Sequence, residues 1–289
     1  ETEEAVLKQL NENISIYDKS GIIEELENRF AKFHNKKHAL LTNSGTAALH
    51  SLFVGANLSA GDEIICPAYT FYATISPIFF TGATPVLVDC EENGNIDPEE
   101  IKRKITKKTK AIIITHMWGI PCKMDEIVGL AKKHNILLFE DASHAHFSEY
   151  KNRLVGTFGD AAAFSLQGQK TLTGGEGGII ITDDDNLFYR ALLLGHYNKR
   201  CKVEIPKDHH LSKFAVTGMG LKLRIHPVAA AITNQQFDKM GNILDSRRRV
   251  AKRLIDELGN LPGLSMPIVS EDINPSWYGF VMQYKPEEL

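Results

Sequence analysis

Short apolar runs alternate with amphipathic segments over residues 38–182. Several runs, such as residues 112–114 and 179–181, are apolar at every position, which is typical of strands buried on both faces of a sheet. Apolar residues also recur at helical spacing over residues 23–33, before the first run. The alternation predicts an α/β fold with a mainly parallel, doubly wound, seven-stranded sheet. The predicted strands are residues 39–42, 63–66, 85–89, 111–115, 136–140, 161–165 and 178–182.

The pattern changes after about residue 195. Residues 198–213 are polar and rich in charge and histidine, which predicts a long exposed loop, whereas residues 228–258 predict a long helix. The chain begins within a helical pattern and ends just after a strand-like run, so we expect it to be part of a longer protein. The expected parts are an N-terminal segment (1–20), a large domain (21–240), and a linking helix with the start of a truncated α+β small domain (241–289).

Composition and charge argue against some classes of protein. The net charge of −3 gives no reason to expect a nucleic acid or an anionic membrane surface as a partner. No apolar stretch is long enough to span a bilayer, so we expect no membrane partner. The four cysteines are far apart and lack a C-x-x-C pair or a histidine at metal-ligand spacing. We therefore predict no metal site and a reducing, cytoplasmic location.

The segment from Thr42 to Leu49 combines the end of a strand, a glycine turn and the start of a helix. Free N–H groups at a helix N-terminus, together with the positive end of the helix dipole, suit a phosphate dianion. Ser44, Gly45 and Thr46 would form this site. Taken alone, an ordinary helix cap is the better interpretation of the same residues.

Asp141 directly follows an apolar strand, so its carboxylate should stand at the carboxyl edge of the sheet. Sheets of this kind bind ligands at that edge. A buried carboxylate needs a partner, and a protonated pyridine nitrogen would provide one. A helix cap is again a plausible alternative.

Ser165 ends another predicted strand, and Lys170 follows it just before the glycine-rich stretch 174–178. Most lysines are solvated surface charges. Beside a phosphate site, however, burial and cationic neighbours would lower the pKa of Lys170 and leave its amine able to attack an aldehyde. Phe71, also just after a strand, could stack on a flat heteroaromatic ring or simply belong to the core.

The order of these elements decides between the alternatives. A phosphate turn, an aromatic residue, a carboxylate after a strand, and then a serine and a lysine before glycines together provide the contacts that pyridoxal phosphate needs. With these motifs the chain resembles the DegT/DnrJ/EryC1/StrS family of sugar aminotransferases, within the aspartate aminotransferase fold type. The resemblance is continuous over about residues 22–258. Its motifs lie at residues 43–46, 61–63, 67–74, 82–85, 116–119, 140–142, 156–160, 164–165, 170 and 175–178.

The resemblance implies a role for each matching residue. Lys170 would form the Schiff base with the cofactor and carry the proton between substrate and cofactor. Asp141 would bind the pyridine nitrogen, Phe71 would stack on the ring, and His144 would lie near the phenolic oxygen. The implied cofactor-binding set is Ser44, Gly45, Thr46, Phe71, Asp141, His144, Ser165, Lys170 and Lys222.

Lys222 is a departure from the family pattern. Many members have an asparagine at this position that reaches the cofactor phosphate of the partner subunit. A lysine would also suit a phosphate, so we expect a homodimer with shared active sites. The surrounding residues 218–227 are similar to members that act on cyclitol ketones such as scyllo-inosose.

Substrate contacts are predicted from loop positions alone. Tyr17, His116 and Trp118 are the candidates, and Arg224 is a possible clamp for a carboxylate or phosphate.

The resemblance implies transfer of an amino group from glutamate or glutamine to a keto-sugar, either a nucleotide-linked sugar or a cyclitol ketone, with pyridoxamine phosphate as the intermediate cofactor form. Relatives that dehydrate have histidine at the Schiff-base position, so Lys170 favours amino transfer. A pyridoxal-phosphate lyase or racemase on the same fold remains an alternative. So does a non-catalytic regulator, although such regulators usually carry a DNA-binding domain and no basic helix-turn-helix is found in this sequence.

Overall fold

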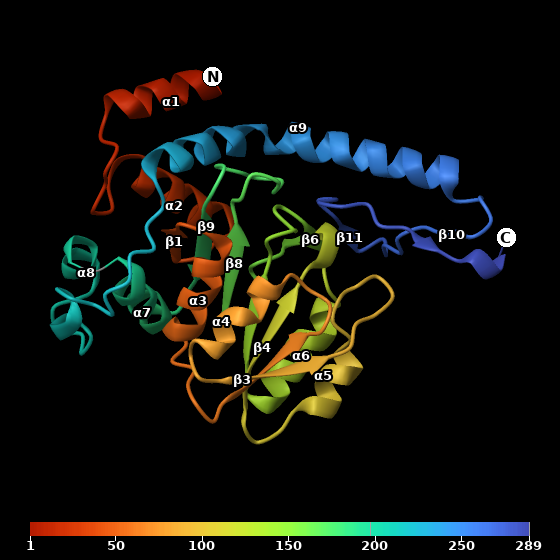
Figure 1. Ribbon diagram of the computed structural model, residues 1–289, viewed down its shortest axis with the longest axis horizontal. Coiled ribbons are helices and arrows are strands. Elements are labelled where there is room, and N and C mark those ends of the chain that lie inside the picture. Colours follow the sequence, from red (N-terminus) through yellow and green to blue (C-terminus); the bar gives the residue numbers. More distant parts are fainter. Residues whose placement is uncertain (197, 289) are drawn as a thin grey trace.

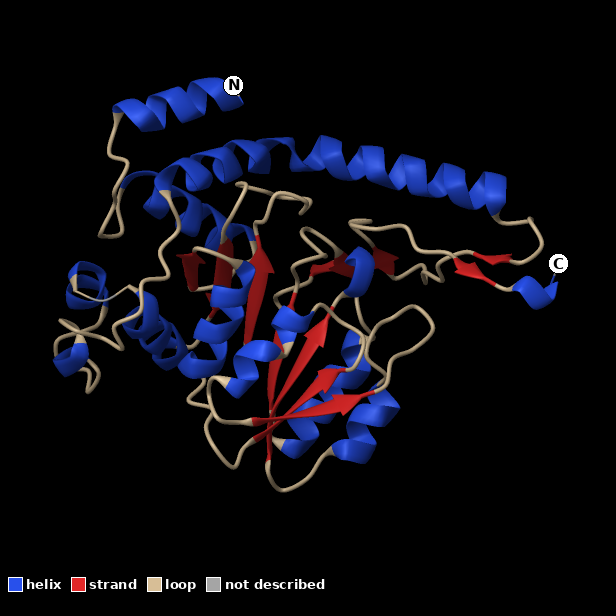
Figure 2. Ribbon diagram, in the orientation of Figure 1, coloured by secondary structure: helices blue, strands red, loops and turns tan. Residues whose placement is uncertain are grey.

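The computed structural model describes residues 1–196 and 198–288, and its centre is a seven-stranded sheet (Figures 1 and 2). The strand order is β1-β9-β8-β5-β4-β2-β3, and β9 runs antiparallel to its neighbours β1 and β8 while the other pairs are parallel. The predicted α/β fold with a mainly parallel sheet of seven strands is confirmed. The strands are β1 (His38–Thr42), β2 (Glu63–Pro67), β3 (Thr84–Val88), β4 (Thr109–Thr115), β5 (Leu137–Asp141), β8 (Ala161–Ser165) and β9 (Gly178–Thr182).

Both faces of the sheet are covered by helices, which explains why the strands are apolar at every position. In β4, Ile113 packs in the core cluster that includes α3 (Gly45–Gly55) and α7 (Asp185–Gly195). Its neighbours Ile112 and Ile114 pack in a different cluster with α6 (Met124–His134). Successive side chains of a strand point to opposite faces, so a central strand such as β4 contributes to two cores.

Helix α9 (Pro227–Leu258) is the long helix that the sequence predicts for residues 228–258. It begins at Pro227, where proline is well tolerated because the first helical N–H needs no intrahelical partner. Together with α2 (Gly21–Phe33) it packs on the face of the sheet opposite α3 and α7. Figure 1 shows α9 running from the sheet toward the last segment of the chain.

The remaining elements are short, apart from the N-terminal helix. They are α1 (Thr2–Asn11), α4 (Ser76–Phe79), α5 (Pro98–Lys104), α8 (Lys199–Glu204), the 3₁₀ turns Tyr72–Thr74, Met117–Gly119, Ser212–Phe214 and Pro286–Glu288, and the strands β6 (Glu149–Tyr150), β7 (Arg153–Leu154), β10 (Leu264–Ser265), β11 (Ile273–Asn274) and β12 (Gln283–Tyr284).

The prediction that residues 198–213 form an exposed loop is wrong for α8, whose residue Arg200 is buried. Arg200 on α8 is 2% exposed, and its guanidinium donates two hydrogen bonds to the Glu27 carboxylate at 2.8 and 2.9 Å and further bonds to Glu204. A buried charge is tolerated only when it is paired and hydrogen-bonded. The pairing partner Glu27 lies 173 residues earlier in the chain, so a local polar pattern could not reveal that the segment is anchored.

Part of the segment after α9 pairs with residues that precede β8. Strand β11 pairs with β6, and β10 pairs with β12. The proposed boundaries between residues 1–20, 21–240 and 241–289 stay a prediction. Among the residues that the structure describes, no helix combines the length and apolar character needed to cross a membrane.

Candidate active site

A cleft of about 620 Å³ lies where the ends of the parallel strands meet the N-terminus of α3. Strands β4, β5 and β8 contribute their last residues, Thr115, Asp141 and Ser165, and the loop after β2 contributes residues 69–71. This is the carboxyl edge of the sheet, where open α/β folds bind their ligands. The lining includes the predicted residues Ser44, Gly45, Thr46, Phe71, Trp118, Asp141, His144, Ser165 and Lys170.

The start of α3 forms one end of the cleft. The Ser44 hydroxyl caps the helix by accepting a hydrogen bond from the Ala47 N–H at 3.1 Å. A side chain at Gly45 would not fit, because a Cβ atom there would lie 2.6 Å from the Cβ of Ser165. The close approach brings the Ser165 hydroxyl to the helix N-terminus, where first-turn N–H groups have no intrahelical acceptor. The two predicted phosphate-binding groups therefore meet at one end of the cleft.

The Asp141 carboxylate is 4% exposed and is held in a fixed orientation. The Thr74 hydroxyl donates to its Oδ2 at 2.7 Å, and the Ser143 N–H donates to its Oδ1 at 3.1 Å. Thr74 in turn lies within hydrogen-bond distance of the Thr70 and Thr115 hydroxyls, at 2.8 and 3.4 Å. Thr74 had no role of its own in the sequence analysis, and only its place in the 67–74 motif pointed to it.

Lys170 lies in the turn after β8, and its N–H donates to the Gln167 carbonyl at 2.8 Å. The side chain is half-buried, and this burial lowers the pKa of the Lys170 ammonium, while the nearby Asp141 carboxylate opposes the change. The glycines that follow allow a tight fit: a Cβ atom at Gly174 would lie 2.4 Å from the Ala229 carbonyl oxygen on α9. The turn that carries Lys170 is thus packed against the long helix.

Phe71 is 55% exposed at the cleft, so the alternative that it belongs to the core is not supported. His144 lines the same cleft and belongs to a stack of rings. Its imidazole is 4.0 Å from the Tyr278 ring, nearly parallel at 14°, and 5.8 Å from the Trp118 ring. Burial, assisted by the Lys170 charge, lowers the pKa of His144 to about 4, so the ring is neutral at physiological pH. Tyr278 was missed by the sequence analysis.

His116 does not reach the cleft, which corrects its prediction as a substrate contact. The side chain is fully buried, its Nε2 donates to the Glu140 carboxylate at 3.1 Å, and its Nδ1 accepts from the Cys122 N–H at 3.1 Å. Burial alone would raise the pKa of Glu140, but the bonds from His116 and from the backbone of Gly159 and Gly156 hold it below its usual value. Both ring nitrogens of His116 are therefore engaged, one with Glu140 on β5 and the other with the backbone just before α6.

Tyr17, Lys222 and Arg224 also lie outside the lining of this cleft. They gather elsewhere: the Arg224 guanidinium lies 4.9 Å and the Lys199 ammonium 5.3 Å from the centre of the Tyr17 ring. Lys222 is exposed and lies near the same ring. A hydrogen bond with Ser15 lowers the pKa of Tyr17, and the positive charges of Arg224, Lys222 and Lys199 add to this effect.

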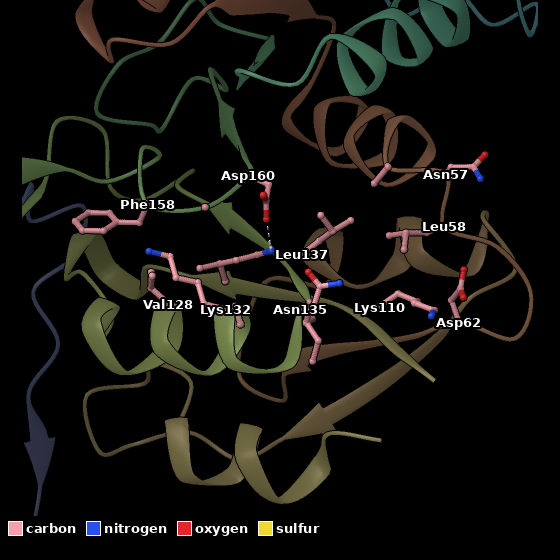
Figure 3. Close-up of a pocket in the computed structure, with 15 residues that line it drawn as sticks. Asn57, Leu58, Asp62, Lys110, Val128, Lys132, Asn135, Leu137, Phe158 and Asp160 are labelled. Carbon is pink, nitrogen blue, oxygen red and sulfur yellow. Dashed lines mark hydrogen bonds between the residues drawn. The ribbon is translucent and has the colours of Figure 1, made fainter. Parts of the chain in front are cut away.

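A second hollow, of about 650 Å³, lies at the opposite edge of the sheet (Figure 3). It is lined by α6, by the first residues of β5 and by surface charges such as Lys110 and Asp62. Asp160 points to β5, and its carboxylate accepts the Leu138 N–H at 2.8 Å. Among the described residues that line this hollow there is neither a histidine nor an aromatic stack, so its size does not make it the better candidate.

A seven-stranded sheet of this order, with a lysine and an aspartate at one cleft of its carboxyl edge, defines the class of pyridoxal-phosphate-dependent enzymes of fold type I. Within that class, the family model of the DegT/DnrJ/EryC1/StrS aminotransferases matches residues 1–288. The chain belongs to this family, and the predicted family is confirmed.

Similar proteins with known descriptions agree with this assignment. GDP-perosamine synthase of Escherichia coli O157:H7 is 37% identical over 237 residues, which are 82% of this chain and 63% of that protein. The spore coat polysaccharide biosynthesis protein SpsC of Bacillus subtilis is 35% identical over 263 residues, 90% of this chain and 68% of that protein. A solved structure of E. coli GDP-4-keto-6-deoxy-D-mannose-3-dehydratase with bound hydrated PLP has a TM-score of 0.88 and 27% identity, covering 99% of this chain and 76% of that one. The chain thus spans about two thirds of the length of these two curated relatives.

Proposed function

We propose that this chain is the greater part of a pyridoxal-phosphate-dependent aminotransferase that moves an amino group from an amino-acid donor, glutamate or glutamine, to a keto-sugar. One observation carries the proposal: Lys170 and Asp141, which lie on different segments, line the same cleft at the carboxyl edge of the sheet. The relatives support the substrate class. They include a GDP-perosamine synthase, a transaminase that forms a dTDP-linked 3-amino sugar and a putative aminotransferase of a scyllo-inosose derivative.

The residues present fit the cofactor. The N-terminus of α3 and the Ser165 hydroxyl would hold a phosphate at one end of the cleft, and the absence of a side chain at Gly45 leaves room for their close approach. Phe71, His144 and Asp141 line the same cleft. There Phe71 would stack on the ring, His144 would lie near its phenolic oxygen and Asp141 would face its nitrogen. When bound, the cofactor supplies an aldehyde that joins to amines and a ring that withdraws electrons from the reacting carbon.

Lys170 and Asp141 would do different work. Burial lowers the pKa of Lys170, which favours the neutral amine, and Nζ would attack an aldehyde and later hold or deliver a proton. Asp141 is fixed by Thr74 and Ser143, and its negative charge would stabilise a protonated ring nitrogen. His144, neutral at physiological pH, can donate a hydrogen bond to an oxygen of the ring without adding a second positive charge.

We further propose that the protein acts as a homodimer. Aromatic side chains stand exposed in the segment between β2 and β3, with Tyr72 at 70%, Phe79 at 62% and Phe80 at 76% exposure, and such a group of apolar residues marks an interface. A dimer would also explain Lys222 and Arg224, which would reach the phosphate or substrate in the partner's cleft. The four cysteines are free thiols, which suits the reducing cytoplasm as its location.

The test of the central proposal is to add pyridoxal phosphate to the purified protein, reduce it with borohydride and map the adduct by mass spectrometry. We expect one modified residue, Lys170, and no stable adduct in Lys170→Ala. Lys110→Ala, at the opposite edge of the sheet, is the matched control and should keep the adduct. Next, conversion of glutamate to its keto acid should depend on an added keto-sugar. Labelling spread over surface lysines in the wild-type protein would reject the proposal.

A further inference from the structure

Tyr278 is placed in the cleft by a segment that lies more than a hundred residues beyond Lys170 in the sequence. The segment is fixed on both sides of Tyr278. The Ser276 N–H donates to the Ser148 hydroxyl and the Ser276 hydroxyl donates to the His144 carbonyl, both at 2.9 Å. On the other side, the Gly279 N–H donates to the Trp118 carbonyl at 3.3 Å.

The fit of this segment is close. A Cβ atom at Gly279 would lie 2.7 Å from the Trp118 ring, and one at Gly119 would lie 2.4 Å from the Ser276 hydroxyl. From α9, the Arg247 guanidinium donates to the Trp277 carbonyl at 2.7 Å. The position of the Tyr278 ring is therefore set by backbone contacts rather than by chance packing of a surface side chain.

Two groups of different chemistry lie against the Tyr278 ring. Its ring stacks on His144 at 4.0 Å, and the Lys170 Nζ lies 4.6 Å from the ring centroid. An ammonium group within about 6 Å of an aromatic centroid is attracted by the negative face of the ring. A neutral imidazole on the ring adds no positive charge that would compete with Lys170.

We propose that Tyr278 is a positioning residue that holds the ε-ammonium of Lys170 on its ring face whenever this side chain is not joined to the cofactor. The proposal rests on the proposed function and deepens it, because amino transfer requires Lys170 to leave the cofactor and to return. A long, flexible side chain set free at that moment needs a place where it stays near the reacting carbon. The Tyr278 face supplies that place with a rigid ring whose segment is fixed by hydrogen bonds.

Other groups around Lys170 also affect its protonation. The Asp141 carboxylate attracts the ammonium, and His144 and His146 lie within electrostatic range of it. Glu176 lines the same cleft and is exposed. None of these charged and titratable residues is changed in a Tyr278 variant, so the contribution of the ring can be measured separately.

The first experiment measures the pH dependence of reductive methylation of Lys170 in the cofactor-free protein, followed by peptide mass spectrometry. Tyr278→Leu keeps the site apolar but removes the ring, and it should lower the pH midpoint of labelling by about 0.5 to 1 pH unit, because the ammonium loses its ring contact. Tyr278→Phe keeps the ring and should leave the midpoint within about 0.2 pH unit. Tyr284→Leu, at a 65% exposed tyrosine of the same segment, is the matched control and should not change it. The midpoint is used because a change in access alters the labelling plateau and not the midpoint.

An unchanged midpoint in Tyr278→Leu overturns the proposal. If that variant does not fold, as judged by circular dichroism, pentafluorophenylalanine at position 278 keeps the shape and reverses the charge distribution of the ring. It should lower the midpoint by at least as much, and an unchanged midpoint again rejects the proposal. A shifted midpoint in a protein that forms no adduct with pyridoxal phosphate would support the Lys170–Tyr278 contact and reject the aminotransferase function. An unchanged midpoint in a protein that does form the Lys170 adduct would retain the aminotransferase function and reject the role of Tyr278.

Discussion

The two edges of the central sheet differ in chemistry far more than in size. The cleft at the carboxyl edge and the hollow at the opposite edge have similar volumes, about 620 and 650 Å³. The hollow is lined by exposed lysines and by acids that bind backbone N–H groups, such as Asp62 with Ser59 and Asp160 with Leu138. The cleft instead brings together a half-buried amine, a buried carboxylate and a neutral histidine.

The difference follows from strand direction. In a parallel sheet the loop that follows each strand begins at the carboxyl edge. Loops from distant parts of the sequence therefore meet there and can place reactive side chains side by side. At the amino edge, loops arrive from helices and chiefly close the fold. The origin of the lining residues therefore identifies the site better than the volume of a hollow does, and paired substitutions at the two edges test this contrast.

The largest effect is expected at the two lysines. Lys170→Ala should reduce amino transfer by about a thousandfold or more, because the residue would act as nucleophile and as proton carrier. Lys110→Ala in the hollow should change the rate by less than about twofold. Steady-state rates of keto-acid formation from glutamate, with an added keto-sugar, measure both. Comparable losses in the two variants would remove the contrast between the edges.

The second contrast, in the rate of amino transfer, is expected between Asp141 in the cleft and Asp62 in the hollow. Asp141→Asn removes the charge that faces the ring nitrogen, and we expect a loss of about a hundredfold in rate. Thr74→Val, which removes the hydroxyl that orients Asp141, should cost about tenfold, since the carboxylate would keep only its bond from Ser143. Asp62→Asn in the hollow should have no effect. Kinetics combined with the absorbance of bound cofactor would separate lost binding from lost catalysis.

The sequence revealed those parts of the cleft that lie directly after strands. Asp141 and Ser165 end apolar runs, and Lys170 precedes glycines whose small size the turn requires, so local pattern was enough to find them. Tyr278 could not be found in this way, because its position depends on a segment that returns from beyond α9. Only the tertiary contacts of Ser276 and Gly279 place it.

His116 shows the opposite error. It directly follows β4, and Asp141 is the last residue of the neighbouring strand β5, so position alone could not tell that the His116 ring turns inward. The deciding partner is the Glu140 carboxylate, which also binds three backbone N–H groups of the loop after β7. A residue after a strand can thus support a neighbouring loop as readily as it can face a ligand, and the sequence does not separate the two.

Acid should destabilise the cleft edge first. Burial lowers the pKa of His34 and His144 to about 4 and that of His146 to about 3, whereas in the unfolded chain a histidine titrates near 6.5. Between about pH 6.5 and 4 the unfolded chain therefore binds more protons, so the free energy of unfolding falls as the pH falls. The slope should approach about 1.4 kcal/mol per pH unit for each of these histidines.

Urea denaturation at pH 7, 6 and 5 measures this slope. His34→Gln should reduce it by about one proton, and His210→Gln, at an exposed histidine, should not. Hydrogen exchange should rise near residues 144–146 before it rises in α6, which borders the hollow. A stability that does not change between pH 7 and 5 would contradict this prediction.

The smallest effect is expected for substitutions at two glycines, Gly45 at the cleft and Gly129 beside the hollow. At Gly45 an added methyl group would lie 2.6 Å from the Ser165 Cβ, so Gly45→Ala must push the helix N-terminus away from Ser165. We expect about tenfold weaker binding of pyridoxal phosphate, measured by titration of its absorbance. Gly129 lies within α6 beside the hollow, and a methyl group added there would meet no described atom within 4 Å. Gly129→Ala should therefore raise the free energy of unfolding by about 0.5 to 1 kcal/mol through helix propensity alone and leave cofactor affinity unchanged. If both substitutions affected cofactor binding equally, tight packing at the carboxyl edge would not be what shapes the phosphate end of the cleft.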